Sequence, residues 1–312
     1  MIELPNDHWQ GNGFVPRLNL AIGIATTGRR DILQAVLPYL AAQSRMPETI
    51  VICVAADTDI DKTAVSRLGL PIRIIKSERG LCRQRNAIMG NVPDADVLLF
   101  LDDDFLLTPT YLSQVERVFL DAPDVVMCTG TVEADGITGP GIPVSEGVRI
   151  IDVVRSRGQD SSPPIMPIYN AYGCNMAVRM RIVRHVGLRF DENLPLYGWL
   201  EDVDFSRQMA RFGKIVRSGA LRGVHLGTKR GRTSGIKLGY SQIANPLYLM
   251  RKRTMSVRHA GVQIFRNVVA NLVKAAQPES WVDRRGRLKG NLRAVTDLLR
   301  GRLAPQNIMT LE

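Results

Sequence analysis

Short apolar runs alternate with segments of helical periodicity through residues 18–120, and this alternation restricts the fold more than any other feature. Each run is short enough for a buried strand, and turn-forming or polar residues bound it. Strands separated by helices form βαβ units, in which the strands lie parallel in one sheet. The sequence therefore predicts an α/β fold with a mainly parallel sheet flanked by helices. The predicted strands are 18–25, 49–55, 71–76 and 97–102, and the predicted helices are 29–43, 81–90 and 108–120.

The last of these apolar runs leads directly into three aspartates, Asp102, Asp103 and Asp104. Adjacent carboxylates repel one another, and burial raises the cost of keeping them ionised. In an open α/β sheet, ligands bind at the carboxyl ends of the strands, where these residues would lie. Carboxylate oxygens there suit Mg²⁺ or Mn²⁺, which commonly also hold a substrate phosphate. An acidic turn that faces water explains the same residues, so this stretch alone leaves both interpretations open.

Charge divides the chain into an acidic part and a basic part. Residues 1–204 contain 19 Lys and Arg against 26 Asp and Glu, whereas residues 205–312 contain 22 against 4. The overall net charge of +11 hides this asymmetry. We therefore expect the two parts to meet different partners.

The cysteines and the apolar runs bear on the cellular compartment. Cys53, Cys82, Cys128 and Cys174 are far apart and form no CxxC pair. This spacing favours small buried side chains over a zinc site or disulfides. No apolar run approaches the length of a membrane span, and the N-terminal residues lack a signal-peptide pattern. These features predict a cytoplasmic protein.

Several short motifs occur in a particular order along residues 17–230. They are the polar turn at 25–30, GL…RN at 80–86, D-x-D at 102–104, GCNMA at 173–177, ED at 201–202 and the later His225. Each is weak alone, but the ordered set resembles family 2 of the glycosyltransferases, and in particular bacterial members that synthesise polysaccharides. The resemblance implies an inverting enzyme with the GT-A nucleotide-sugar-binding fold.

The resemblance also implies roles for single residues. Asp102 is expected to contact the nucleotide ribose, and Asp104 to bind the metal on the diphosphate, with His225 completing the metal shell. Arg85 is expected near the nucleotide, and Asp202 is expected to be the catalytic base. A metal and cationic side chains would stabilise the charge on the departing diphosphate. A positioned base typically contributes about 10²–10⁴-fold to the rate.

Further binding residues are predicted from their places beside these motifs. Family members commonly carry two aspartates after the second strand, where this chain has Ala55 and Ala56, so Asp57 is expected to take over recognition of the base. The predicted donor-binding residues are Thr26, Arg29, Asp57, Arg85, Asp102 and Asp103, and the predicted acceptor-binding residues are Tyr197, Trp199 and Glu201.

Most of these roles have a structural alternative. Asp202 is also a favoured residue for capping a helix. Arg85 can pair with Asp102 instead of a nucleotide, although the nucleotide is the favoured partner, and an isolated histidine such as His225 is more often structural than a ligand. Trp199 suits either a sugar-stacking platform or the core. The basic segment 228–235 is either a lid over the diphosphate or a solvated linker.

We divide the chain into three parts on these patterns. Residues 1–16 form an N-terminal lead, 17–232 the GT-A catalytic domain, and 233–312 a basic helical extension. Within the catalytic domain, residues 130–170 are rich in Gly, Pro and Ser and are expected to form loops. Two amphipathic helices are expected in the extension, at 264–276 and 287–303.

The predicted function is metal-dependent transfer of a sugar from a UDP-sugar to a saccharide or lipid-linked acceptor in surface or exopolysaccharide synthesis. One alternative is a sugar nucleotidyltransferase, which needs a Gly-rich loop after the first strand. The turn ATTGRR supplies a single glycine there. The other is a basic nucleic-acid-binding protein, but aromatic residues make up only 6% of the chain and its basic excess is confined to the last third. We therefore expect no nucleic-acid partner.

The basic extension suggests where such an enzyme works. Each basic side chain near an anionic leaflet contributes about 1 kcal/mol to binding. We expect the protein to associate peripherally with the inner face of the cell membrane, with the apolar faces of its helices mostly packed and their basic surface on lipid headgroups. The residues expected to contact lipid are Arg251, Lys252, Arg253, Arg284, Arg285, Arg287 and Lys289.

Overall fold

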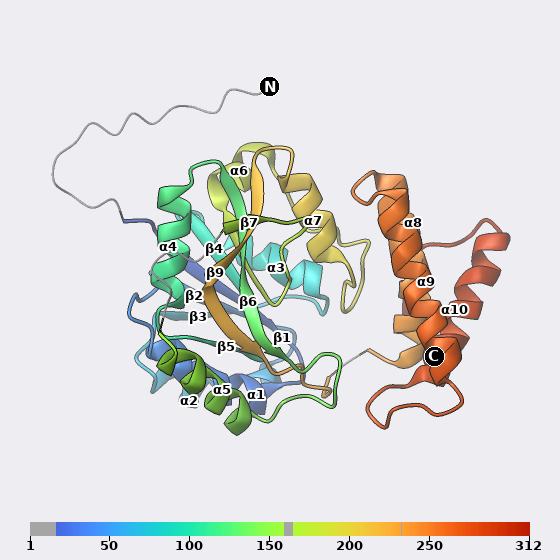
Figure 1. Cartoon of the computed structure of the whole chain (residues 1–312), viewed down its shortest axis with the longest axis horizontal. Helices are drawn as coiled ribbons and strands as arrows, with labels where there is room; N and C mark the ends of the chain where they lie inside the picture. Colours follow the sequence, from blue (N-terminus) through green and yellow to red (C-terminus); the bar gives the residue numbers. More distant parts are fainter. Residues whose placement is uncertain (1–16, 159–164, 232) are drawn as a thin grey trace.

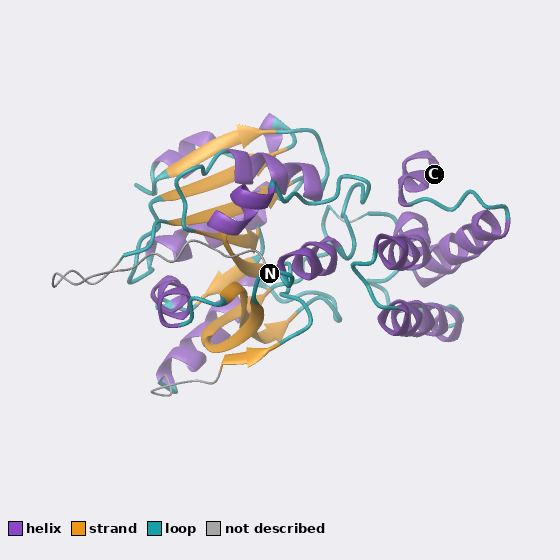
Figure 2. Cartoon of the chain, turned by 90° about the horizontal axis from the view of Figure 1, so that it is seen from above, coloured by secondary structure: helices purple, strands orange, loops and turns teal. Residues whose placement is uncertain are grey.

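The computed structural model describes residues 17–158, 165–231 and 233–312. The predicted N-terminal lead, residues 1–16, lies outside the described residues. A sheet with helices on both faces forms one part of the molecule, and a group of helices at its end forms the other (Figures 1 and 2). The predicted α/β class with a helical C-terminal region is confirmed.

The N-terminal half of the sheet consists of four parallel strands in the order β3-β2-β1-β4. The register places Ala25 beside both Cys53 and Asp102, so three strands end at the same edge. Polar residues that follow these strands are therefore brought together. The strands are β1 (Leu20–Thr26), β2 (Thr49–Val54), β3 (Ile72–Lys76) and β4 (Val97–Asp102), all within two residues of the predicted positions.

Both faces of this half-sheet are apolar because helices cover both. Alternate residues of a strand point to opposite faces. In β4, Leu99 and Leu101 pack with one set of helices, whereas Leu98 and Phe100 pack with the other. The first set is α1 (Arg30–Ala41), α2 (Lys62–Ser66) and α4 (Tyr111–Asp121), and the second is α3 (Leu81–Gly90), α6 (Met180–Val186) and α7 (Glu201–Met209).

Beyond β4 the sheet becomes mixed, so the parallel arrangement holds over only part of it. The order continues as β8-β6-β9-β5, and β7 also pairs with β9. His225, the last residue of β9, pairs with Phe105 on one side and Asp135 on the other. The register thus carries His225 to the loop that holds the aspartates. These strands are β5 (Phe105–Leu107), β6 (Val125–Asp135), β7 (Ile165–Pro167), β8 (Asn175–Arg179) and β9 (Lys214–His225).

The expectation that residues 130–170 form loops is wrong over much of their length. β6 continues to Asp135, and α5 (Val144–Ser156) forms a helix of three turns. Ile151 of α5 packs against Leu106, Val224 and Leu226, so an apolar face fixes the helix on β5 and β9. Most of the Gly and Pro residues stand before this helix, but Gly147 lies within its buried face, where a Cβ atom would collide with Leu226 and Leu106.

The C-terminal residues form three helices that pack on one another, α8 (Gly235–Lys252), α9 (Val257–Lys274) and α10 (Arg284–Leu299). Gly239 of α8 and Gly290 of α10 lie where these helices touch. A Cβ atom at either residue would overlap backbone atoms of the other helix, so glycine permits this close crossing. Short 3₁₀ segments occur at Asp57–Asp59 (η1) and Pro305–Thr310 (η2).

Hydrogen bonds and ion pairs hold α8 against the part of the molecule that contains the sheet. The ammonium group of Lys252 lies 2.6 Å from Asp191 and 2.7 Å from Asp204, which is fully buried in α7. Asn245 donates to the backbone oxygen of Trp199 at 2.8 Å. The described residues contain no helix with both the length and the apolar character needed to cross a membrane.

Candidate functional site

The three aspartates at the end of β4 differ in their burial and in the side chains that contact them. Asp103 is buried, accepts a hydrogen bond from Thr26 Oγ1 at 2.7 Å, and lies 3.0 Å from Arg29 Nη1. Burial raises the pKa of Asp103 to about 6, although Arg29 opposes the rise. Asp102 is half-buried and Asp104 is buried. Arg29 lies 3.0 Å from Asp103 and 3.9 Å from Asp104, and Arg85 lies 3.3 Å from Asp102, so these two cations offset the repulsion among the three carboxylates.

Asp104 and His225 lie side by side at the ends of β4 and β9. The Oδ2 atom of Asp104 accepts the backbone amide of Thr228 at 2.8 Å, and its Oδ1 atom lies 3.4 Å from His225 Nε2. Burial alone would raise the pKa of Asp104, but His225 and Arg29 lower it below its ordinary value. Burial would likewise lower the pKa of His225, but the carboxylates of Asp104 and Asp135 raise it to about 10.

These residues fit a divalent cation. Asp102, Asp104 and His225 each offer one ligand atom, and the three atoms lie within 4.8 Å of one another. The Oδ1 atom of Asp104 is buried without a hydrogen-bond partner among the described residues, and a buried polar atom of this kind calls for an explanation. His225 Nδ1 lies 2.9 Å from Asp135 Oδ1. The carboxylate fixes the imidazole with Nε2 toward Asp104, as the outer partner of a metal-binding histidine does.

Arg85 is a buried cation at the centre of the site. Its guanidinium lies 2.5 Å from Glu201 Oε1 and 3.3 Å from Asp102 Oδ1, and it donates to the Gly173 carbonyl at 2.8 Å. It also lies over the Phe100 ring, with 5.5 Å between the guanidinium carbon and the ring centroid. The ion pair that the sequence left open is therefore present. Direct contact between Arg85 and a nucleotide stays a prediction.

Glu201 and Asp202 begin α7 and face the same space. Glu201 is buried, and both burial and the neighbouring Asp202 raise its pKa, although Arg85 opposes them. Asp202 accepts the backbone amides of Gly173 at 3.1 Å and Val203 at 2.8 Å. Burial also raises the pKa of Asp202, against these hydrogen bonds. Leu200, not Asp202, is the N-cap of the helix, so the capping alternative does not describe this residue.

A cavity of about 320 Å³ joins the predicted base to the candidate metal site. Asp202, Asp102 and His225 all line it. Tyr197 and Trp199 lie on its wall, and Tyr197 is exposed whereas Trp199 is half-buried against the core. Apart from Asp104, the predicted catalytic, metal and acceptor residues therefore line one cavity. Glu201 lines it as well, but its carboxylate is engaged by Arg85.

A second cavity extends from Asp102, at the end of β4, across the end of β1 to α3. Gln84 of α3 donates to the backbone oxygens of Thr26 at 2.9 Å and Cys53 at 2.8 Å, and so ties these strand ends together. The cavity brings residues predicted to bind the donor together with part of the basic segment. Its walls include Thr26, Arg29, Arg79, Gln84, Asp102, Asp103, Gly231 and Thr233.

The structure places Asp57 away from this cavity. Asp57 is exposed and pairs with Lys62 at 3.2 Å and Lys76 at 3.0 Å. Recognition of a base by Asp57 stays a prediction. Asp59 is instead buried, and it accepts the amides of Gly28 at 2.7 Å and Ala56 at 2.8 Å. It therefore links the turn after β1 to the turn after β2.

The sequence reasoning missed three residues that build the site. They are Asp59 and Gln84, which hold the strand ends together, and Asp135, which orients His225. Asp59 lies in the stretch VAADTDID, only two residues after Asp57. The presence of several aspartates after the second strand is therefore the signal that could have identified it. No local pattern identifies Asp135, because its contact depends on the pairing of β6 with β9.

Comparison with known proteins assigns the family. The profile of glycosyl transferase family 2 matches residues 21–187, which is more than half of the chain, so the protein belongs to this family. It is a glycosyltransferase, and the sugar nucleotidyltransferase alternative is set aside. No curated protein matches the chain in sequence.

Solved structures share the fold at low sequence identity. The mannosyltransferase PcManGT from Pyrobaculum calidifontis, in complex with GDP-Man and Mn²⁺, aligns with a TM-score of 0.54 and 14% identity, covering 95% of this chain and 86% of that one. TarS 1–349 from S. aureus aligns with a TM-score of 0.53 and 13% identity, covering 94% and 83%. GalNAc-T7 with UDP, GalNAc and Mn²⁺ has the same score and identity, and this chain covers 58% of it. The GT-A fold is thereby confirmed.

Proposed function

We propose that the protein is a divalent-metal-dependent, inverting glycosyltransferase that moves a sugar from a nucleotide sugar to a saccharide or lipid-linked acceptor. The observation that carries the proposal is the cavity lined by Asp202, Asp102 and His225, the last two of which form the candidate cation group with Asp104. A base on one wall and a cation site on another are what a single displacement at a sugar carbon requires.

Asp104 and His225 are the proposed metal ligands, with Asp102 between the metal and the nucleotide ribose. A bound cation supplies positive charge to the departing diphosphate. A group of two carboxylates and one imidazole suits Mn²⁺ better than Mg²⁺, because Mg²⁺ prefers oxygen ligands and retained waters. Mn²⁺ is therefore the proposed ion. Asp103, Thr26 and Arg29 form the neighbouring wall of the donor cavity.

Asp202 is the proposed base, and takes the proton of the acceptor hydroxyl as that oxygen attacks the sugar. Two backbone amides hold its carboxylate in one orientation. Burial raises its pKa, which makes the carboxylate a stronger base than an exposed aspartate. Attack from the side opposite the diphosphate inverts the anomeric configuration. Tyr197 and Trp199, beside Asp202, are the proposed acceptor contacts.

The donor is proposed to be a UDP-sugar, and the product a surface or exopolysaccharide, on the resemblance to bacterial polysaccharide-synthesis enzymes. The structural neighbours carry GDP-Man in one case and UDP-GlcNAc in another, so the fold does not select the base. Arg79, Gly80, Thr27 and Gln84 line the donor cavity, and none of them lines the cavity that holds Asp202. We place the nucleoside there.

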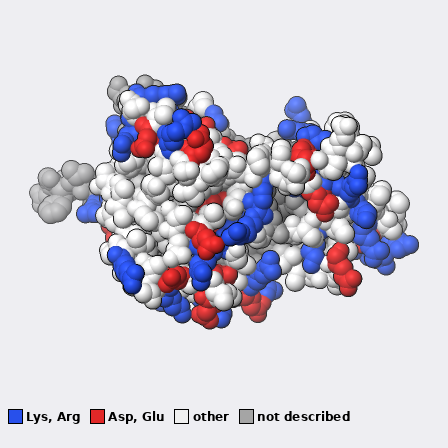
Figure 3. Space-filling view, turned by 90° about the horizontal axis from the view of Figure 1, so that it is seen from below, with Lys and Arg blue, Asp and Glu red and all other residues white. Residues whose placement is uncertain are grey.

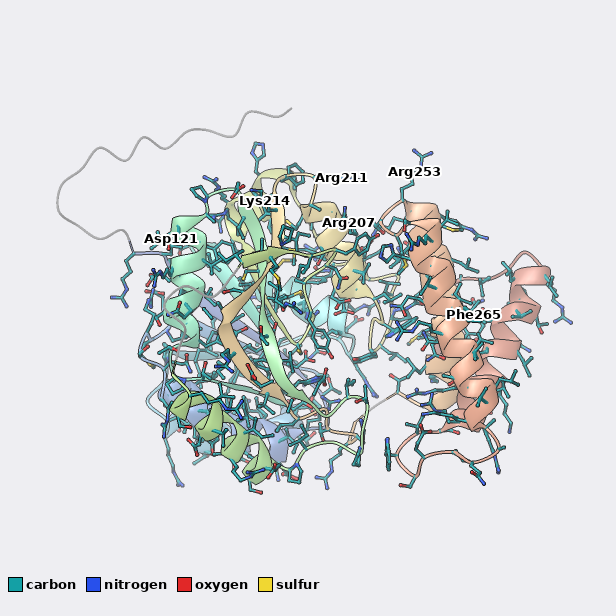
Figure 4. The ribbon with its side chains drawn as sticks, viewed as in Figure 1. Asp121, Arg207, Arg211, Lys214, Arg253 and Phe265 are labelled. Atoms are coloured by element: carbon teal, nitrogen blue, oxygen red, sulfur yellow. The ribbon has the colours of Figure 1, made fainter. Side chains whose placement is uncertain are left out.

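The basic C-terminal helices are proposed to hold the enzyme on an anionic membrane surface on the cytoplasmic side. Figure 3 shows Lys and Arg side chains gathered at the end of the molecule that these helices form. Two of the predicted lipid contacts have internal roles instead, because Lys252 pairs with Asp204 and Arg284 pairs with Glu279. Arg251, Arg253 and Arg285 remain exposed, and Arg253 projects outward at the end of α8 (Figure 4).

A direct experiment is to incubate the purified protein with Mn²⁺ and a panel of nucleotide sugars, UDP-sugars first, and to follow release of the nucleoside diphosphate. We expect release from one donor, and its loss in EDTA. Asp104→Ala should abolish release and also the binding of Mn²⁺, measured by electron paramagnetic resonance. Asp152→Ala, an exposed aspartate of α5, is the matched control. Full activity in EDTA would contradict the metal role.

A further inference from the structure

Helix α9 has an unusual distribution of side chains, because amides accompany Ile264 and Val268 on its inner side and further apolar residues face outward. Asn271 is fully buried, and donates to Gln242 of α8 at 2.7 Å and to Asn291 of α10 at 2.9 Å. Asn267 accepts from Gln242 at 2.9 Å. The contact of α9 with its two neighbours is thus built partly from side-chain amides, whereas helices in globular proteins usually turn an apolar stripe to the core.

The opposite side of α9 carries a strip of exposed apolar residues, which we call the α9 strip. The spacing of its members places them on one helical face. Phe265 is 69% exposed, Leu272 61% and Val273 70%, so the expectation that the apolar faces are mostly packed is wrong for this helix. Figure 4 locates Phe265 on the C-terminal helices, apart from the sheet. The α9 strip consists of Val262, Phe265, Val269, Leu272 and Val273.

Helix α10 also carries exposed apolar residues. Leu292 is 61% exposed and Leu299 83% exposed. Single exposed leucines are ordinary on a protein surface, but apolar residues repeated along a helix face mark an interaction site. The surface of the C-terminal helices therefore fits an apolar partner.

The charges around the α9 strip indicate the chemistry of that partner. Arg258 and Arg266 are exposed on α9, each four residues from Val262, which is about one helical turn. No Asp or Glu occurs anywhere from residue 205 to residue 278. Two copies of the chain joined through this strip would bring arginines together without acids to neutralise them. An anionic bilayer instead offers both an apolar interior and negative headgroups.

We propose that the α9 strip, with Leu292 and Leu299 of α10, inserts into the boundary between headgroups and acyl chains of an anionic membrane. Helices whose exposed apolar face is bordered by cations lie in this plane rather than across the bilayer. The inference deepens the membrane part of the proposed function, because it adds an apolar contact that salt does not screen to the electrostatic attraction that salt weakens.

The first test is sedimentation of the purified full chain with vesicles of phosphatidylcholine, alone or mixed with phosphatidylglycerol. We expect binding to the mixed vesicles, with a fraction that persists at high salt. Phe265→Ser/Leu272→Ser should lower the partition coefficient about tenfold or more and remove the salt-resistant fraction. Val153→Ser/Val186→Ser, which changes exposed apolar residues of α5 and α6, is the matched control and should bind as the natural protein does.

The second test places a reporter in the strip. In Phe265→Trp, the added tryptophan should shift its emission to the blue when mixed vesicles are added, and brominated acyl chains should quench it. Binding without a blue shift, or equal binding by the serine variant, would overturn the proposal. It would also be overturned by a dimer in sedimentation velocity that Phe265→Ser/Leu272→Ser dissolves and that does not bind vesicles. Release of nucleoside diphosphate is measured separately, so failure of the enzymatic proposal leaves these results interpretable.

Discussion

His225 directs its Nδ1 atom to Asp135 at 2.9 Å and its Nε2 atom toward Asp104 at 3.4 Å. Asp135 therefore fixes both the ring orientation and the nitrogen that faces the candidate cation. Removing an outer partner of this kind typically lowers metal affinity about 10–100-fold. We predict a loss of that size for Mn²⁺ in Asp135→Asn, measured by electron paramagnetic resonance without any substrate.

Tyr172 provides the control for this prediction, since its hydroxyl donates to the other oxygen of Asp135 at 2.9 Å. Tyr172→Phe removes that hydrogen bond but keeps the contact between Asp135 and His225, so the loss of affinity should be smaller. Equal Mn²⁺ affinity in Asp135→Asn and the natural protein would mean that His225 is not a ligand.

Asp202 is predicted to act in chemistry rather than in binding. Asp202→Asn preserves the size of the side chain, and its single amide oxygen can keep one of the two backbone hydrogen bonds, so donor affinity should change little and the melting temperature should fall only slightly. Its kcat should fall about 10²-fold or more, because the amide cannot take a proton. The measurement is steady-state release of nucleoside diphosphate alongside donor binding by calorimetry. Near-normal kcat with a lower melting temperature would make the residue structural.

Arg85 is predicted to position Glu201 and Asp102 together. A lysine carries the charge but not the planar fork, so it cannot keep contacts to Glu201, Asp102 and the Gly173 carbonyl at once. Each lost charge-assisted hydrogen bond corresponds to about 1.5–3 kcal/mol. We expect Arg85→Lys to lower kcat/KM by on the order of 10–100-fold. Arg83→Lys, on the exposed side of the same helix, should have no such effect; equal effects in the two variants would refute the positioning role.

The elements that surround the site could be predicted from local patterns. The run LLFL at 98–101 is apolar on both faces, and β4 is buried between two layers of helices as that pattern requires. Helix α3 ends at Gly90, as the sequence indicates. The sequence does not predict helix α5, because Gly, Pro and Ser residues within and around it suggest a loop.

Contacts within the site were harder to predict because they join distant segments. His225 reaches Asp135 through a register of β6 and β9 that no short motif encodes. The place of Asp57 after β2 predicts that it recognises the base, yet the buried aspartate is Asp59, two positions later. A 3₁₀ turn over Asp57–Asp59 decides which of the two points inward. Motif order therefore located the strand ends, and tertiary pairing decided the partner of each side chain.

Lys252 is predicted to fasten the C-terminal helices to the helix that begins with Glu201 and Asp202. Its ammonium group bridges Asp191 and Asp204, and Asp204 also accepts from Thr254 Oγ1 at 2.6 Å. Replacing the lysine by methionine leaves the fully buried Asp204 with one cation fewer. We expect Lys252→Met to lower the free energy of unfolding by about 1.5–3 kcal/mol, the range for a hydrogen bond to a charged group. Chemical denaturation followed by circular dichroism measures this change.

The control for this prediction is Arg251→Met, which alters the neighbouring exposed residue of α8. Its free energy of unfolding should stay within about 0.5 kcal/mol of that of the natural protein. Similar stabilities for Lys252→Met and Arg251→Met would show that the bridge does not hold the two parts together.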